Sequence, residues 1–263
     1  MFTFKAQPLV RCMSPYFAEF IGTMILILFG NGVVANVVLK KTKGNDAGWI
    51  VISWGWGMGV AVAVYTVGHI SGAHINPAVT VSLASIGHFG WDQVAGYIIA
   101  QMLGAIVGST LVWLVYLAHY REKNDPELIR ATFCTSPAIR KPALNFLTEF
   151  IATAMLIFGI LAIAENAAPG NKENLINLED AFSTWFNPLL VGLLVFAIGL
   201  SLGGPTGYAI NPARDLGPRI AHALLPIPNK GGSDWGYSWI PVVAPLLGGT
   251  TGAVLFHISG IAT

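Results

Sequence analysis

Residues 203–220 read GGPTGYAINPARDLGPRI and place an asparagine, prolines and an Arg-Asp pair inside an otherwise apolar region. A related stretch, SGAHINPAVT, occupies residues 71–80. Asparagine is a favoured helix N-cap, and proline fits the first helical turn because its missing N–H has no helical partner there. Each Asn-Pro-Ala tripeptide therefore predicts a helix start. The residues concerned are Asn76, Pro77, Ala78, Asn211, Pro212 and Ala213.

The composition around these motifs indicates a membrane protein. Of 263 residues, 54% are hydrophobic and only 10% are charged, whereas soluble domains carry about 25% charged residues. Runs of about 20 apolar residues can cross the hydrocarbon core as helices. Six candidate spans lie near residues 15–39, 48–69, 94–118, 144–165, 186–203 and 237–260.

The segments that follow each asparagine, 76–87 and 211–225, are apolar but too short to cross a bilayer. Their length predicts half-helices that enter and leave by the same face. The residues before them would be irregular backbone at membrane depth, which is tolerated only when it is buried in protein or lines a water-filled cavity. Two such segments facing each other predict a pore.

The chain repeats itself. AEFIGTMILILFG, which contains Glu19, resembles TEFIATAMLIFG, which contains Glu149, and the two Asn-Pro-Ala motifs follow in the same order. Each half, about 14–118 and 144–260, has three spans, and an odd number forces the halves into opposite orientations. We expect an all-α membrane protein with six transmembrane helices and two re-entrant half-helices, forming one domain over residues 1–263.

Charged residues at membrane depth admit two interpretations. Glu19 and Glu149 could form a proton relay, but their equivalent positions in the repeat favour carboxylates that accept hydrogen bonds from loop backbone. Asp215 could be an acid or ion site; near a helix start it is better explained by pairing with Arg219 and holding the loop that orients Arg214.

Other classes of function find little support in the sequence. There is no GxxxxGK[ST] nucleotide loop, no nucleophile with a partner base and no basic run, so we expect neither an enzyme nor a nucleic-acid partner. The histidines have no metal-ligand spacing, and Cys12 and Cys134 do not form a metal motif. No metal or cofactor is expected.

The twin Asn-Pro-Ala motifs in inverted halves, with the paired glutamates and the following Arg-Asp, resemble the aquaporin (major intrinsic protein) family over nearly the whole chain. NPARDLGPR, with Asp215 and Arg219, looks like the aquaglyceroporin branch, which includes bacterial glycerol facilitators. The resemblance implies a passive channel for glycerol and other small uncharged solutes, with water, that excludes ions and protons. It also implies a homotetramer in the lipid bilayer of the cell membrane.

Alignment with that family implies a selectivity filter formed by Trp56, Gly199, Tyr208 and Arg214. Two aromatic faces would hold the carbon backbone of a solute, while the guanidinium donates hydrogen bonds. Gly199 is expected to leave open space where water-selective relatives carry a histidine. Carbonyl groups of the unwound segments would accept hydrogen bonds. They belong to Gly72, Ala73, His74, Gly207, Tyr208 and Ala209.

At the pore centre, Asn76 and Asn211 are expected to donate amide hydrogens into the lumen, beside the positive ends of both half-helices. Dihydroxyacetone, urea and protonated small acids are further candidate solutes. Two alternatives remain open: a water-selective pore, if the Tyr208 hydroxyl narrows it, and an alternating-access transporter. The family topology places both termini in the cytoplasm, although the lysines at 40–43 then lie outside, against the positive-inside rule.

Overall fold

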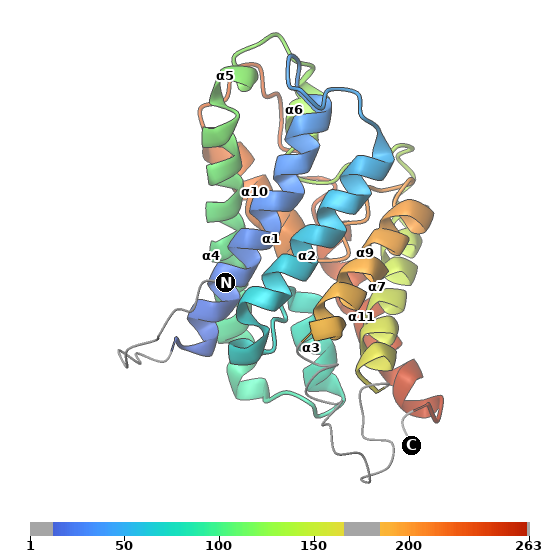
Figure 1. The fold of residues 1–263 in the computed structure, drawn as a ribbon. Coiled ribbons are helices and arrows are strands. Elements are labelled where there is room, and N and C mark those ends of the chain that lie inside the picture. Colours follow the sequence, from blue (N-terminus) through green and yellow to red (C-terminus); the bar gives the residue numbers. More distant parts are fainter. Residues whose placement is uncertain (1–12, 166–184, 262–263) are drawn as a thin grey trace, which may run out of the picture.

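The computed structural model describes residues 13–165 and 185–261, which form a bundle of helices without a β-strand in this part of the chain (Figure 1). Five helices are long and apolar enough to cross a membrane, and a sixth, α9, has 16 residues. The long helices are α1 (Pro15–Val38), α2 (Trp49–Ser71), α4 (Trp91–Val115), α7 (Pro142–Glu165), α9 (Asn187–Leu202) and α11 (Ile240–Ile258).

Four further helices complete the described chain. Half-helices α3 (Pro77–Ser85) and α10 (Pro212–Leu224) begin directly after the two capping asparagines. Short helices α5 (Leu117–Tyr120) and α6 (Pro126–Ala131) lie in the connection between the halves, where the sequence predicted none. The predicted fold class, six spanning helices with two half-helices, is confirmed.

Both half-helix starts are capped by an asparagine side chain. Asn76 Oδ1 accepts a hydrogen bond from the Ala78 N–H at 2.8 Å. Asn211 Oδ1 accepts from the N–H groups of Ala213 at 3.0 Å and Arg214 at 3.2 Å. These bonds satisfy backbone donors that a helix start otherwise leaves without partners, so each Asn-Pro-Ala fixes its half-helix locally.

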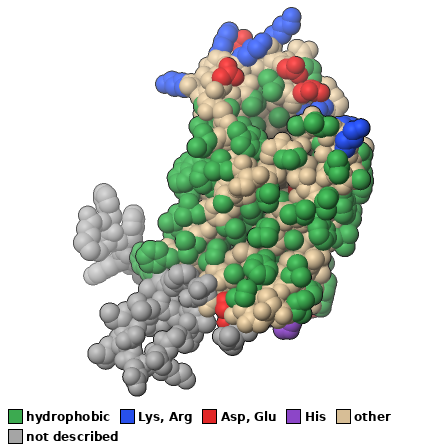
Figure 2. All heavy atoms as spheres, turned by 90° about the vertical axis from the view of Figure 1, so that its right-hand side faces the viewer, with side chains coloured by type: hydrophobic (Ala, Val, Ile, Leu, Met, Phe, Trp, Pro, Cys, Tyr) green, Lys and Arg blue, Asp and Glu red, His purple; other side chains and the backbone are tan. Residues whose placement is uncertain are grey.

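The two ends of the bundle differ in side-chain chemistry (Figure 2). At the termini end, α1 begins and α11 ends; at the opposite loop end lie α5, α6 and the loop 39–48 (Figure 1). In Figure 2, Lys, Arg, Asp and Glu side chains gather at the loop end, above a band rich in hydrophobic side chains. The exposed apolar residues of the long helices include Phe29, Leu103 and Met155. The protein is a multi-pass membrane protein.

Equivalent helices of the two halves pack through glycines. In the first half, Gly108 of α4 lies against α1, and a Cβ there would come within 2.6 Å of the Met24 carbonyl oxygen. In the second half, Gly252 of α11 lies in the same way against the backbone of α7 at Ala154. Small residues allow this close approach of membrane helices.

A third close approach joins the two halves. Where α2 crosses α9, a Cβ on either Gly57 or Gly192 would lie 2.6 Å from the other residue's carbonyl oxygen. The two glycines are 135 positions apart, as are Asn76 and Asn211. The halves therefore meet about corresponding residues, and this contact holds α2 and α9 beside the central cavity.

Candidate pore and solute site

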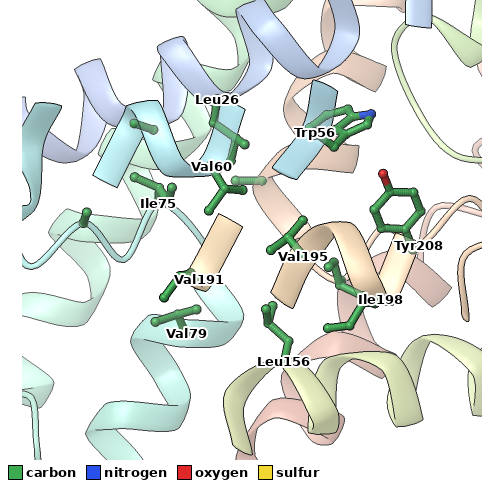
Figure 3. Close-up of a cluster of buried hydrophobic side chains, with 14 of the residues drawn as sticks. Leu26, Trp56, Val60, Ile75, Val79, Leu156, Val191, Val195, Ile198 and Tyr208 are labelled. Atoms are coloured by element: carbon green, nitrogen blue, oxygen red, sulfur yellow. The ribbon is translucent and has the colours of Figure 1, made fainter. Parts of the chain in front are cut away.

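A cavity of about 290 Å³ runs through the centre of the bundle, from Trp56 and Arg214 toward the loop end to Leu83 and Asn187 toward the termini end. One part of its wall is apolar. Figure 3 shows Val60, Val191, Val195 and Leu156 converging, with Trp56 and Tyr208 to one side. The apolar side chains that line the cavity include Leu26, Val60, Val64, Val79, Leu156 and Val195.

The facing wall is formed by residues 72–76 and 208–211 of the two unwound segments. In each segment two non-glycine residues have positive φ: Ala73 at 47° and Ile75 at 44°, and Tyr208 at 39° and Ile210 at 45°. Such conformations are costly for residues with a Cβ and persist only when their surroundings enforce them. The repeated pattern indicates that both segments are held by equivalent contacts.

The first segment is held by Glu19, which is fully buried. Its Oε1 accepts hydrogen bonds from the His74 N–H at 2.9 Å and the Ser71 hydroxyl at 2.7 Å. Its Oε2 accepts from the Ile75 N–H at 2.6 Å and from Gln101 Nε2 at 2.8 Å. Four hydrogen bonds therefore hold the Glu19 carboxylate in place. They favour a structural role for Glu19 over a role as a proton relay.

Glu149 makes the equivalent contacts in the second half and is also fully buried. Its Oε1 accepts from the Ala209 N–H at 2.9 Å and from the Thr206 hydroxyl at 2.6 Å. Its Oε2 accepts from the Ile210 N–H at 2.9 Å. Each glutamate thus binds two consecutive backbone N–H groups of the unwound segment in its own half.

The two capping asparagines connect the halves at the centre. Asn76 Nδ2 donates to the Ile210 carbonyl at 2.8 Å, and Asn211 Nδ2 donates to the Ile75 carbonyl at 2.8 Å. The sequence predicted amide groups that point into the lumen. Both asparagines line the cavity, but one hydrogen of each amide is already used in this crossed pair, so only the other remains for a solute.

At the loop end of the cavity, Arg214 lies over the face of Trp56, with its Cζ atom 3.9 Å from the ring centroid. Trp56, Tyr208 and Arg214 are all buried and line the cavity. Within the described chain, Trp56 Nε1, Tyr208 Oη and Arg214 Nη1 have no hydrogen-bond partner. The three residues line the cavity, and these polar atoms have no protein group to pair with.

Two expectations about this region need correction. Gly199 does not leave open space, because a Cβ there would lie 2.8 Å from Tyr208 Cζ and 3.0 Å from its hydroxyl oxygen. The Tyr208 ring occupies that space, so Gly199 lies behind the ring and outside the cavity lining. Gly207 is also outside the lining; it packs against Thr135, whereas Gly72, Ala73, His74, Tyr208 and Ala209 do line the cavity.

The Asp215–Arg219 pair is fully buried, with Arg219 Nη2 2.7 Å from Asp215 Oδ1. Asp215 Oδ2 accepts from the Thr135 N–H at 2.7 Å and hydroxyl at 2.6 Å. Arg219 donates to the carbonyls of Thr135 at 2.9 Å and Ser233 at 2.7 Å. The pair therefore fastens two loop-end segments to α10, directly after Arg214. No sequence signal marked Thr135 or Ser233.

Two titratable groups beside these loops are perturbed. Burial raises the pKa of the Cys134 thiol to about 12, so it stays protonated and unreactive near neutral pH. Lys230 Nζ donates to the carbonyls of His222 and Ala223 at 2.7 Å and of Leu225 at 2.6 Å, at the end of α10. Partial burial lowers the pKa of Lys230. Its positive charge interacts favourably with the partial negative charge at the C-terminal end of α10.

A family model described as major intrinsic protein matches residues 8–256. The chain belongs to the major intrinsic protein family. Within that family, it is similar to the probable glycerol uptake facilitator protein of Thermotoga maritima, with 59% identity over 93% of this chain and 99% of that protein. The glycerol uptake facilitator protein of Bacillus subtilis is 52% identical over 93% and 84% of the two chains.

Among solved structures, the aquaglyceroporin from Plasmodium falciparum matches with a TM-score of 0.76 and 30% sequence identity. The match covers 92% of this chain and 93% of that one. The resemblance to the aquaglyceroporin branch, inferred from the motifs, is confirmed. In the residues that the structure describes, no three His, Cys, Asp or Glu side chains group as a candidate metal site.

Proposed function

We propose that this protein is a passive transmembrane channel for glycerol and other small uncharged solutes, with water, and that it excludes ions and protons. The observation that carries the proposal is the central cavity, which has an apolar wall and unpartnered polar atoms of Trp56, Tyr208 and Arg214. The similarity to the glycerol uptake facilitators and to the aquaglyceroporin supports glycerol as the solute.

A polyol matches this wall chemically. Its carbon backbone can lie against Trp56 and the valines and leucines, while its hydroxyls pair with the polar atoms and with carbonyls of the unwound segments. The solute thereby exchanges its hydration stepwise for protein hydrogen bonds. Dihydroxyacetone, urea and protonated small acids share the small size and lack of charge, and they belong to the same proposed class.

Cations meet a different energy profile. The N-termini of α3 and α10 meet at the centre, where Asn76 and Asn211 each donate to a backbone carbonyl of the other half. Each terminus carries partial positive charge. Arg214 adds a full positive charge at the cavity wall. A cation or hydronium ion is repelled by the positive charge at both places. A neutral solute carries no net charge and is not repelled.

The residue roles follow from these contacts. Trp56, Tyr208 and Arg214 form the filter, with Gly199 providing room behind the Tyr208 ring, and Glu19 and Glu149 hold the unwound segments. Asp215 and Arg219 position the loop-end segments around Arg214. The backbone of residues 72–74 and 208–209 supplies acceptors along the pore.

The same proposal covers assembly and location. The protein is not an enzyme, and it forms a homotetramer in the cell (plasma) membrane, with both termini in the cytoplasm and both repeats within one channel domain. Its broad exposed apolar surface supports burial against lipid or other subunits. The basic residues that this topology places on the cytoplasmic side, Lys5, Arg11 and Lys172, lie outside the described residues.

Stopped-flow light scattering on proteoliposomes tests this function. A glycerol gradient should cause rapid shrinkage from water efflux and then rapid reswelling from glycerol entry, with linear concentration dependence and no ion coupling. Shrinkage without faster reswelling than in empty vesicles would identify a water-selective pore. Saturable, ion-coupled uptake would identify a transporter.

A further inference from the structure

Trp49 contacts the filter from outside the cavity. It is the first residue of α2 and lies two helical turns before Trp56, so both indoles project from similar faces of the helix. Among the described residues, Trp56 and Tyr208 line the cavity and Trp49 does not. The ring centroids of Trp49 and Tyr208 are 5.8 Å apart, in an edge-to-face arrangement with an interplanar angle of 76°. Tyr208 therefore has the cavity as one neighbour and the Trp49 indole as another.

The C-terminal end of α9 fixes the position of the Trp49 indole. Trp49 Nε1 donates to the Gly199 carbonyl at 2.8 Å. Gly199 belongs to the last turn of α9, whose carbonyls have no acceptor role inside the helix. Gly203 follows as the C-cap, and a Cβ there would lie 2.9 Å from Trp49 Cζ2 and 2.6 Å from Tyr208 Cδ1. The glycine leaves room for both rings, which pack closely against the same backbone.

A second tryptophan of α2 shows what is particular to Trp49. Tryptophans are enriched at membrane–water interfaces, where a partly exposed ring serves as an anchor. Trp54 is 47% exposed and meets Phe196 edge-to-face, with ring centroids 5.1 Å apart. Trp49 is 39% exposed and makes the same kind of contact. In the described chain neither Trp54 nor Phe196 lines the cavity, so only the Trp49 contact reaches a filter residue.

We propose that Trp49 is a positioning residue that sets the size limit of the channel by holding the Tyr208 ring at the cavity wall. The proposal rests on the proposed conduction of glycerol and extends it to the size of polyol that passes. Erythritol, which is one carbon longer than glycerol and bulkier, must displace the ring further. Because Trp49 resists that displacement, the channel favours glycerol over the larger polyol.

The size of the effect follows from the aromatic contact. Without the Trp49 ring, the Tyr208 ring can recede at a lower cost in free energy. The permeability of a solute that must displace the ring then rises by about 2- to 12-fold, the factor equivalent to one edge-to-face aromatic pair. Water passes without displacing the ring, so its permeability should change less than about twofold.

The test compares erythritol, glycerol and water permeability in proteoliposomes that contain the full chain or its variants. Trp49→Leu removes the ring and the donor, and it should raise the ratio of erythritol to glycerol permeability by about 2- to 12-fold. Trp49→Phe keeps an aromatic ring but loses the bond to the Gly199 carbonyl, so it should raise the ratio by a smaller factor. The matched control, Trp54→Leu, should leave the ratio unchanged.

A second background tests whether Trp49 acts through Tyr208. In Tyr208→Ala the ring that Trp49 holds is absent, so adding Trp49→Leu should change the ratio no further. Two residues that act through one contact show this non-additivity, whereas independent residues give additive effects. An equal change in the ratio with and without the Tyr208 ring would overturn the proposed role.

Other results would also overturn the size limit set by Trp49 while the proposed function stands. They are an unchanged ratio in Trp49→Leu with normal water flux, or an equal rise in Trp54→Leu. If Trp49→Leu passes no water and is therefore not a folded channel, the wild-type ratio in Trp49→Phe would overturn it instead. Wild-type vesicles that pass water but no glycerol would overturn the proposed function and this inference together.

Discussion

Substitution of Gly199 by alanine tests the filter directly. The new Cβ would lie 2.8 Å from Tyr208 Cζ and 3.1 Å from Ser53 Cβ, whereas ordinary contacts begin at 3.4 Å. The ring must therefore recede by about 0.6 Å, the difference between the 2.8 and 3.4 Å separations. Two further groups already pack against the Tyr208 ring. They are Trp49, whose ring centroid is 5.8 Å from that of Tyr208, and the backbone at Gly203. The remaining direction for the ring is toward the cavity.

The cost follows from this geometry. Forcing a methyl group into a packed site costs about 1–3 kcal/mol, and the Tyr208 ring avoids that cost by moving into the pore. A glycerol molecule must push the ring back to pass, so the same energy adds to its barrier. Glycerol permeability should fall by about 5- to 150-fold. Water is small enough to pass the displaced ring, so water permeability should fall less than threefold.

Gly204→Ala is the matched control, because no atom lies within 4 Å of a Cβ at that glycine. Stopped-flow measurements on both variants should show a glycerol defect only for Gly199→Ala. Wild-type glycerol permeability in Gly199→Ala would refute the proposed narrowing by Tyr208. A parallel loss of water and glycerol at equal protein incorporation would show instead that the whole pore had collapsed.

Three further outcomes follow from buried groups. Arg219→Met leaves the buried Asp215 carboxylate without its ion pair and should lower the free energy of unfolding by about 3–5 kcal/mol, seen as a lower unfolding temperature in detergent. The control Arg140→Met removes a more exposed ion pair and should cost at most about 1 kcal/mol. Equal decreases in unfolding temperature would contradict a stabilising role of the buried pair. Arg214→Val should admit small cations and lower glycerol permeability about tenfold, as the charged donor is lost, and planar-bilayer currents equal to wild type would count against its barrier role. In a Cys12→Ser background, maleimide at pH 8 should leave Cys134 unlabelled until the protein is unfolded, because its thiol pKa is about 12; rapid labelling of the folded channel would contradict its burial.

Local chemistry made much of the fold predictable. The six apolar runs gave the spans to within a few residues, and the caps at Asn76 and Asn211 fixed where α3 and α10 begin, since both signals depend on neighbouring residues alone. Features made by distant residues were not predictable. Thr135 meets Asp215 across 80 positions, and a polar loop residue carries no periodicity that indicates such a partner.

The filter shows the same distinction. Family alignment identified Gly199 and Tyr208, but the space over the glycine depends on the rotamer of the tyrosine and on the positions of Trp49 and Gly203. These are properties of packing in three dimensions. Asn187 also precedes a proline, yet it lies inside α9 and its Oδ1 has no hydrogen-bond partner in the described chain. An Asn-Pro pair predicts a helix start, but the sequence does not show whether that asparagine caps the helix.

The crossed hydrogen bonds between Asn76 and the Ile210 carbonyl, and between Asn211 and the Ile75 carbonyl, have a consequence for biosynthesis. When the first half leaves the ribosome, the carbonyl that completes its centre has not yet been made. The nascent chain can insert its first helices, but a continuous aqueous path arises only after the second re-entrant segment arrives. A chain that ends before the second half therefore lacks both hydrogen bonds that join the halves at the centre of the pore.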